Sequence, residues 1–597
     1  MLSPKNTVLL LNASFPQNCA NNVISIYFCR MDSRFFCYLL LLLSIFGITP
    51  SLLAQKNDPL AGKDTMLLEK ERHEEISIAE KIDMDIPEQD ISKLEIKPLS
   101  YSPMENTFMP AFPAPAITPA PLPKPKWEKL MPNYVKFGYG RFDNPFAQVF
   151  LSNGRNDDYD WGLTANYTTL QNQYLPNTKQ SQLNLSARTS YYLSKHTLSA
   201  KAYFNRAGYR YFADTFSVRE TFLPDIETSW QSFGIVAAIG SNFSATQKLI
   251  HNTKLSVNQF STKSSLKELA VSLSSDVTLK IDDQLGILLP ISATFYKINQ
   301  QFKLPTVLDT SHNRIALDFQ PQVRYDLTNQ IRIQGGFRIS NFTFGDSSVF
   351  RFSPLAELSY MAIPDILTPY LTYSGGLIIN TLESIFQENR YTYPELKLMP
   401  SAEKLNIRAG VRGSTGQGIS YDIAFHTRSV EQALFYVTPS TADSTSYLPN
   451  IGYFTLAYDK NFVQTGFSAE FNYDSQLKTR ANAKITYYNL KTNSLQYAYH
   501  LPALRVQLSG AYRFADKLTV SLGGAFVGKR TMAYDYTYQK SIAENGFLDL
   551  FVQTDYRFSK RFSIFLSAHN LLNSKYYRWY GYQERPFDFK AGGAIAF

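Results

Sequence analysis

The chain has 597 residues, of which 44% are hydrophobic, with a mean hydropathy of −0.22 and a formal net charge of +9. After residue 54 no stretch approaches the roughly 18 consecutive apolar residues that a membrane-spanning helix needs, which excludes a bundle of membrane helices. Aromatic residues make up 14%, mostly 39 Tyr and 43 Phe, and these types suit half-buried strands and membrane interfaces.

The first 54 residues contain the pattern of an export signal. Residues 31–34 form a short basic segment, residues 35–48 are apolar, and residues 52–54 end in an alanine suited to cleavage. We therefore predict a signal peptide at 31–54 and an upstream extension of the gene product at 1–30. All three cysteines precede the cleavage site, so the mature chain is expected to have no disulfide and no thiol chemistry.

Residues 55–126 differ in composition from everything after them. They hold 9 basic and 13 acidic residues, and nine prolines fall between 98 and 125. Such a segment cannot build a core, so we predict that it is disordered, acidic and periplasmic. It is either a solvated tail, a periplasmic recruitment arm, or a strip that enters a basic lumen. The remainder, 127–597, has 47 basic and 36 acidic residues and is predicted to be a separate domain.

From residue 127 onward, apolar and polar residues alternate with period two. Short turns are predicted at 194–196, 326–329, 515–516 and 559–561. They alternate with long excursions at 206–229, 297–313, 376–402, 436–450 and 531–546. Tight turns at one rim and long loops at the other are typical of an outer-membrane barrel. About 22 alternating runs predict an all-β protein: a transmembrane antiparallel β-barrel of about 22 strands. A soluble β-sandwich array is the alternative.

The last eleven residues, 587–597, alternate strictly and end on Phe597. The last strand of a closed membrane barrel must pair with the first, because an unpaired edge is not tolerated in lipid. We therefore predict that Phe597 takes part in barrel closure and that the protein lies in the outer membrane.

Residues 366–597 resemble the C-terminal half of the barrel of TonB-dependent outer-membrane receptors. The family's L-K-P-E-like loop and following strand correspond to residues 393–403 and 405–412. The family's closing pattern corresponds to residues 570–577 and to the final strand that ends in Phe597. The resemblance implies an outer-membrane barrel and uptake of a solute. Family members have a folded plug domain of well over a hundred residues, whereas the leader here has 72 residues and no clear TonB box, so the chain is expected to lack a plug.

Ten basic residues fall on the polar side of their strands and are the candidate site residues. They are Arg188, Lys201, Arg332, Arg338, Arg408, Arg412, Lys484, Arg505, Arg513 and Lys590. If the lumen is open, an excess of basic residues favours anionic solutes. The alternative is a lumen-wall network in which these residues pair with carboxylates of neighbouring strands.

No cluster of residues indicates catalysis, a metal site or a cofactor, and the seven histidines are scattered. We predict that the protein is not an enzyme and binds no nucleic acid. Three functions remain open: a transporter or receptor for an unknown solute, a passive wide channel, and a scaffold that anchors an envelope or surface complex. The expected partners are outer-membrane lipid, the barrel assembly machinery and, for a transporter, a separate plug or periplasmic partner.

Overall fold

The protein is described from a computed structural model. The structure describes residues 131–597 apart from 155, 172–177, 212–226, 243–246, 265, 303–307, 394–395, 417, 439–451, 476–477 and 536–539. The predicted upstream extension (1–30), signal peptide (31–54) and disordered acidic segment (55–126) therefore lie outside the described residues.

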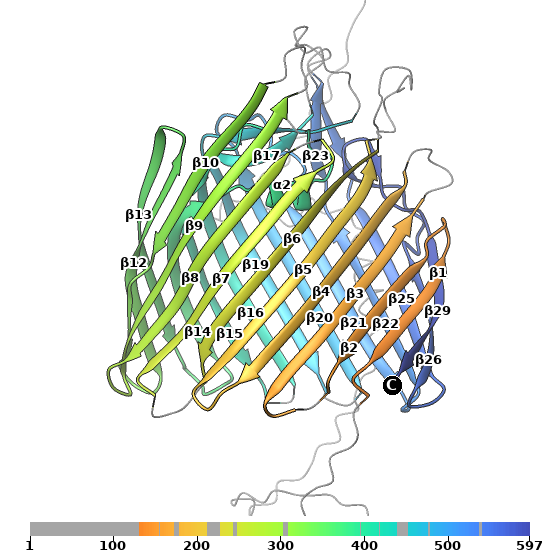
Figure 1. The fold of residues 1–597 in the computed structure, drawn as a ribbon, viewed down its shortest axis with the longest axis horizontal. Helices are drawn as coiled ribbons and strands as arrows, with labels where there is room; N and C mark the ends of the chain where they lie inside the picture. The colour runs from red at the N-terminus through yellow and green to blue at the C-terminus, as the bar shows by residue number, and fades with distance from the viewer. Residues whose placement is uncertain are drawn as a thin grey trace, which may run out of the picture. The chain divides into compact units, whose positions relative to one another are not determined.

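Almost all of the described chain is antiparallel β-structure, and its largest sheet contains 23 strands (Figure 1). These strands are β1 (Tyr134–Gly140), β2 (Phe146–Ser152), β3 (Tyr159–Leu170), β4 (Gln180–Tyr192), β5 (His196–Arg210), β6 (Glu227–Ser241), β7 (Leu249–Thr262), β8 (Lys267–Lys280), β9 (Leu285–Phe302), β10 (Leu308–Phe319), β11 (Gln322–Asp326), β12 (Ile331–Phe344), β13 (Ser347–Tyr360), β14 (Thr368–Ile378), β15 (Ser401–Ser414), β16 (Ile419–Glu431), β19 (Phe462–Asp474), β20 (Thr479–Lys491), β21 (Leu504–Phe514), β22 (Leu518–Val527), β25 (Phe547–Arg557), β26 (Phe562–His569) and β29 (Asp588–Ala596).

Within the described residues, the loops carry one helix and three hairpins. They are the helix α2 (Leu382–Glu388) and the hairpins β17–β18 (Ala433–Val437 and Thr455–Asp459), β23–β24 (Arg530–Asp535 and Lys540–Glu544) and β27–β28 (Tyr577–Trp579 and Tyr582–Gln583).

The strands β10 and β11 are one barrel strand that is interrupted at Pro321. Phe319, at the end of β10, pairs with Ile291 of β9. Gln322, at the start of β11, pairs with Leu288 of β9. The two pairs are three residues apart on each strand, so the register is the same on both sides of the interruption. Proline has no N–H to donate, which removes a ladder hydrogen bond without inserting a residue. The barrel therefore has 22 strands, as the sequence predicted.

The barrel is closed by its first and last strands. β1 pairs with β29 in an antiparallel register that starts at Tyr134 and Ala596. Just beyond the strand ends, Asn133 N donates to Phe597 O at 3.1 Å and Phe597 N donates to Asn133 O at 3.0 Å. No edge of the sheet is left for lipid to contact, which is the condition for spanning a membrane with strands.

The two rims of the barrel carry connections of different length (Figure 1). Short turns such as 193–195 and 515–517 lie at the rim that holds the C-terminus, whereas connections such as 379–400 and 432–461 lie at the opposite rim. In outer-membrane barrels the short turns are periplasmic and the longer loops extracellular. Two excursions are shorter than expected. The predicted loop 206–229 is partly strand, because the ladder between β5 and β6 continues to the pair Arg210 and Glu227, and the predicted loop 297–313 is partly strand, because the ladder between β9 and β10 continues to the pair Phe302 and Leu308.

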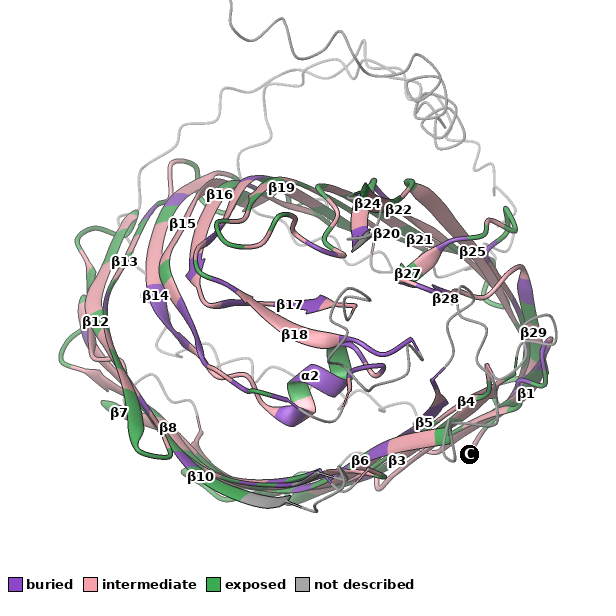
Figure 2. Ribbon diagram, turned by 90° about the horizontal axis from the view of Figure 1, so that it is seen from above, coloured by how far each residue is buried: buried purple, intermediate pink, exposed green. Residues whose placement is uncertain are grey.

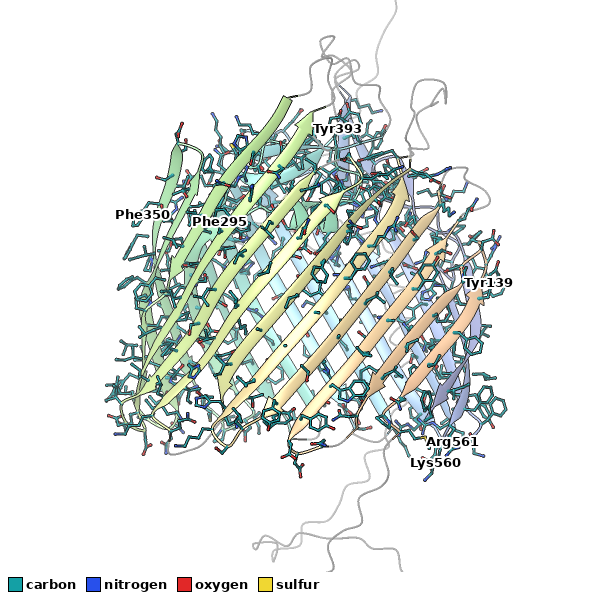
Figure 3. The ribbon with its side chains drawn as sticks, in the orientation of Figure 1. Tyr139, Phe295, Phe350, Tyr393, Lys560 and Arg561 are labelled. Carbon is teal, nitrogen blue, oxygen red and sulfur yellow. The ribbon has the colours of Figure 1, made fainter. Side chains whose placement is uncertain are left out.

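Large apolar side chains cover the outside of the barrel (Figure 3). Phe350 is 64% exposed, Phe137 54% and Leu273 53%, and each alternates along its strand with residues that face inward. The basic pair Lys560 and Arg561 lies in a turn at the periplasmic rim (Figure 3). A closed barrel with an apolar outer belt faces lipid, which confirms the predicted outer-membrane location.

Candidate functional site

Loops from the extracellular rim fold back into the barrel, where α2, β17 and β18 lie inside the ring of strands (Figure 2). The loops are 379–400, 570–587 and the described part of 432–461. Their apolar side chains pack with the extracellular ends of β5 to β9 in one buried cluster, which we call the mouth core. Its members are Ala207, Tyr209, Tyr211, Trp230, Phe260, Leu266, Ile298, Leu382, Ile385, Phe386, Tyr391, Leu396, Leu398, Tyr436, Tyr453, Phe454, Trp579 and Tyr582. Burial of this apolar surface stabilises the inward position of the loops.

Two carboxylates hold α2 against the barrel wall. Glu268 of β8 is 2% exposed and accepts a hydrogen bond from Leu382 N at 3.0 Å. Glu383 accepts hydrogen bonds from Ser232 Oγ at 2.6 Å and from Asn258 Nδ2 at 2.5 Å. The helix is therefore fixed to β6, β7 and β8 rather than free in the lumen.

Aromatic contacts join the loops to one another. The rings of Tyr391 and Tyr582 are stacked with their centroids 3.5 Å apart, and the Tyr582 hydroxyl donates to Gly452 O at 2.7 Å. Phe454 packs edge-on against Trp579 at 5.5 Å. Aromatic pairs contribute about 0.5–1.5 kcal/mol beyond the area they bury. The three loops thus pack as one unit, although they are far apart in the sequence.

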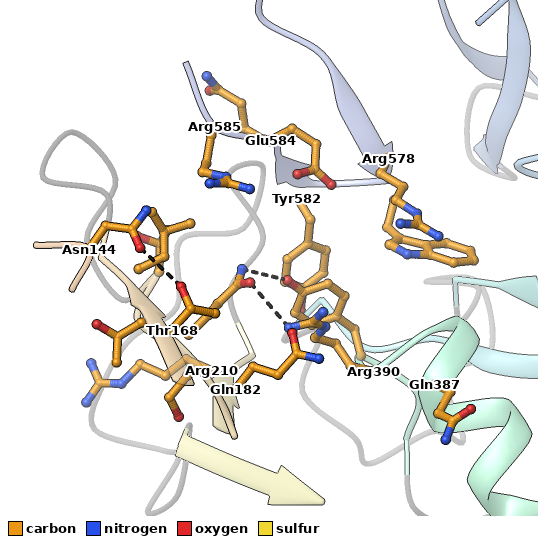
Figure 4. Close-up of a pocket in the computed structure, with 18 of the residues that line it drawn as sticks. Asn144, Thr168, Gln182, Arg210, Gln387, Arg390, Arg578, Tyr582, Glu584 and Arg585 are labelled. Atoms are coloured by element: carbon orange, nitrogen blue, oxygen red, sulfur yellow. Dashed lines mark hydrogen bonds between the residues drawn. The ribbon is translucent and has the colours of Figure 1, made fainter. Parts of the chain in front are cut away.

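Two adjoining cavities lie beside the β27–β28 hairpin and together form what we call the chamber. Their volumes are about 770 Å³ and about 320 Å³. Five residues line both cavities: Glu388, Arg578, Trp579, Glu584 and Arg585. In the smaller cavity, Arg390 Nη1 donates to Gln180 Oε1 at 3.3 Å (Figure 4). Cavities of several hundred Å³ accommodate a small-molecule ligand.

The smaller cavity of the chamber has an excess of positive charge. Its basic lining residues are Arg210, Arg390, Arg578, Arg585 and Lys590, and its acidic ones are Glu388 and Glu584. Asp588 pairs with Arg585 at 3.1 Å, and Glu227 pairs with Arg210 at 2.6 Å. Arg578 forms no ion pair or hydrogen bond with the residues that the structure describes. Its guanidinium can therefore bind a ligand without breaking an existing hydrogen bond or ion pair.

Buried groups determine the charge of the larger cavity. Arg530 is 6% exposed, and its Nη2 donates to the carbonyl of Tyr577. Burial, and then the nearby charge of Arg530, lower the pKa of His500 to about 3. His500 is consequently neutral near pH 7, and the positive charge of this cavity comes from arginines, including Arg505 and Arg530.

The ten basic residues selected from the sequence are placed in different surroundings. Six form ion pairs along the barrel: Arg188 with Asp160 at 3.8 Å, Arg332 with Asp326 at 2.6 Å, Arg338 with Asp318 at 2.6 Å, Arg408 with Asp422 at 2.8 Å, Arg412 with Glu357 at 3.7 Å and Lys484 with Glu470 at 2.9 Å. Arg505 and Lys590 line the chamber, Lys201 lies 5.8 Å from the ring centroid of Tyr203, and Arg513 lies at the periplasmic end of β21. Ion pairing thus neutralises much of the predicted positive wall.

Four arginines of the chamber were not among the residues predicted from the sequence: Arg390, Arg530, Arg578 and Arg585. Arg390 and Arg585 lie in irregular loop segments, and Arg530 and Arg578 lie in the short hairpins β23–β24 and β27–β28. The alternation of the barrel strands gives no direction for side chains in either place. One signal was present: Arg578 directly follows the family-like pattern 570–577 and is flanked by aromatic residues.

Within the described ranges, no three His, Cys, Asp or Glu side chains are grouped so that they could hold a metal ion. In the same part of the chain, no helix has the length and apolar character needed to cross a membrane. That the protein binds no cofactor remains a prediction from the sequence.

No protein-family model and no curated protein matches the sequence. The ferripyoverdine receptor of the Pseudomonas aeruginosa outer membrane matches in structure, with a TM-score of 0.61 at 15% identity over 78% of this chain and 71% of that chain. The FrpB iron transporter from Neisseria meningitidis has a TM-score of 0.61 at 11% identity, over 79% and 82%. The ferric-catecholate import receptor Fiu from Escherichia coli K12 has a TM-score of 0.57 at 10% identity, over 78% and 81%. The chain therefore has the fold of these outer-membrane iron receptors, which confirms at the level of fold the resemblance of its second half to TonB-dependent receptors.

Proposed function

We propose that the protein takes up an anionic solute across the outer membrane and binds it in the chamber. The observation that carries the proposal is Arg578, which lies among an excess of basic side chains and makes no hydrogen bond or ion pair within the described part of the chain. An arginine presents a fork of N–H donors that matches carboxylate and phosphate groups. The structural neighbours are a ferripyoverdine receptor, an iron transporter and a ferric-catecholate import receptor. An anionic iron chelate therefore belongs to the class of solutes we propose.

The inward-folded loops favour a binding protein over a passive wide channel. The mouth core and the cross-loop contact between Tyr391 and Tyr582 bring loop segments into the lumen, which restricts free diffusion. The proposed role is transport and not catalysis. Energised release would need a moving part, and we propose that a separate plug or periplasmic partner supplies it. Insertion by the barrel assembly machinery into outer-membrane lipid is part of the same proposal.

The role of Arg578 in binding an anionic solute can be tested with citrate, a multivalent anion. Arg578→Gln should weaken citrate binding to the purified full chain by about tenfold or more. A hydrogen bond to a charged group contributes about 1.5–3 kcal/mol, and about 1.4 kcal/mol corresponds to a factor of ten. Arg513→Gln is the matched control, because it removes an arginine from the opposite end of the barrel. Isothermal titration calorimetry gives both affinities. Equal affinities for the two variants, or no citrate binding by the unmodified protein, would contradict the proposal.

A further inference from the structure

A row of three asparagines crosses the barrel wall at the position of α2. Asn166 of β3 pairs with Asn184 of β4, which in turn pairs with Asn205 of β5. Directly opposed residues on neighbouring strands lie about 4.5–5.5 Å apart, so the three amides are side by side. None of them makes a side-chain hydrogen bond to a residue that the structure describes. Each amide therefore offers donors and an acceptor to a ligand.

A tyrosine ring lies flat on the wall next to this row. A Cβ atom added at Gly234 would be 2.3 Å from Tyr203 Cζ, so the ring covers the bare backbone of Gly234. Only glycine leaves the space for this packing. Tyr203 also lines the cavity. The wall thus provides an aromatic surface beside hydrogen-bonding amides.

These residues face α2 across a cavity of about 540 Å³. Its lining includes Ser384 and Gln387 of the helix, and Gln387 also lines the smaller cavity of the chamber, so the two cavities adjoin. Lys201 and Glu383 are its charged lining residues, and their charges cancel. Glu383 is already bound to Ser232 and Asn258. In contrast to the chamber, this cavity has no excess charge.

We infer that this cavity is a second solute-binding site and that it takes an uncharged, hydroxyl-rich group of the carbohydrate class. Hydroxyl groups donate and accept hydrogen bonds, as do the three amides. The C–H face of a sugar ring is apolar and packs on the flat face of an aromatic ring such as Tyr203. That the site lies on the path of a transported solute rests on the proposed function. Its preference for a hydroxyl-rich group rests only on the residues that line the cavity.

Binding of maltohexaose, a linear neutral oligosaccharide, tests the inference. The purified full chain, in a detergent without sugar head groups, should bind maltohexaose in saturation-transfer NMR and calorimetry. Tyr203→Ala should weaken this binding at least tenfold, and Tyr203→Phe should retain most of it, because the ring is kept. Tyr488→Ala is the matched control: Tyr488 follows the lipid-exposed Tyr487 in β20 and contacts His426, away from the cavity.

The mobility of unheated samples on electrophoresis shows that each variant is folded. Absence of binding by the unmodified protein, equal binding by Tyr203→Ala, or an equal loss in Tyr488→Ala would overturn the inference. Polyethylene glycol of similar length should not bind, and its binding at the same affinity would also overturn it. Arg578→Gln should leave maltohexaose binding unchanged. Loss of citrate binding in that variant tests the chamber alone, so the two proposals can fail separately.

Discussion

The assignment of strand faces can be tested at two adjacent residues of β8. Leu273 lies near the middle of the strand and is 53% exposed on the outer face, where Leu273→Lys places a charge in lipid. Ser272 faces the lumen, where it accepts a hydrogen bond from Thr294 at 3.0 Å, and Ser272→Lys places the same charge in water. A lysine at the bilayer midplane costs about 2–4 kcal/mol. With about 1.4 kcal/mol for each factor of ten, Leu273→Lys should lower the folding equilibrium constant roughly 30-fold to 700-fold.

The lumen variant loses one hydrogen bond, which contributes about 0.5–1.5 kcal/mol, and its new charge stays hydrated. The free energy of unfolding is obtained from urea titrations of the barrel in phosphatidylcholine vesicles, followed by the electrophoretic mobility of unheated samples. We expect a clear gap between the two variants, with Leu273→Lys the less stable. Equal destabilisation by the two substitutions would show that the strand faces are assigned wrongly. The residues assigned to the lumen would then be wrong as well, because they rest on the same faces.

Three further outcomes are expected. Deletion of Phe597 should lower the yield of folded barrel, because it removes two hydrogen bonds to Asn133 and the end of the closing strand; quantitative folding of the deletion variant on electrophoresis would count against this role. Deletion of residues 57–120 should leave a folded barrel with unchanged or raised conductance in planar bilayers, because the ring closes between β1 and β29; an unfolded barrel would refute this. The melting temperature should fall as the pH drops from 6.5, the ordinary pKa of His, towards 3. In this range the unfolded chain binds a proton at His500, whereas the buried side chain in the folded protein stays neutral. Above pH 6.5 both states are neutral at His500, and its contribution to stability no longer changes with pH. His500→Asn, chosen because asparagine tolerates the positive φ of 63° at this position, should flatten the dependence, and an unchanged slope would contradict the assignment.

The sequence alone determined the barrel. Lipid on one side of each strand and water on the other impose a period of two that can be recognised from neighbouring residues, as around Leu273. The same local rule located the short turns and predicted the closing strand that ends at Phe597. It also anticipated 22 strands in spite of Pro321, because a proline removes one hydrogen bond and leaves the alternation unchanged.

Tertiary structure alone decided what occupies the lumen. The ten basic residues could be assigned to a face but not to partners, because an ion pair such as Arg338 with Asp318 depends on the strand register. Arg390, Arg530, Arg578 and Arg585 lie in irregular loops or in short loop hairpins, and their positions follow from packing between segments far apart in the chain, such as Tyr391 on Tyr582. The asparagine row required the register of three strands. The alternation of residues along each strand determines which side chains face lipid. Which side chains a solute can contact is determined by packing between segments that are far apart in the sequence.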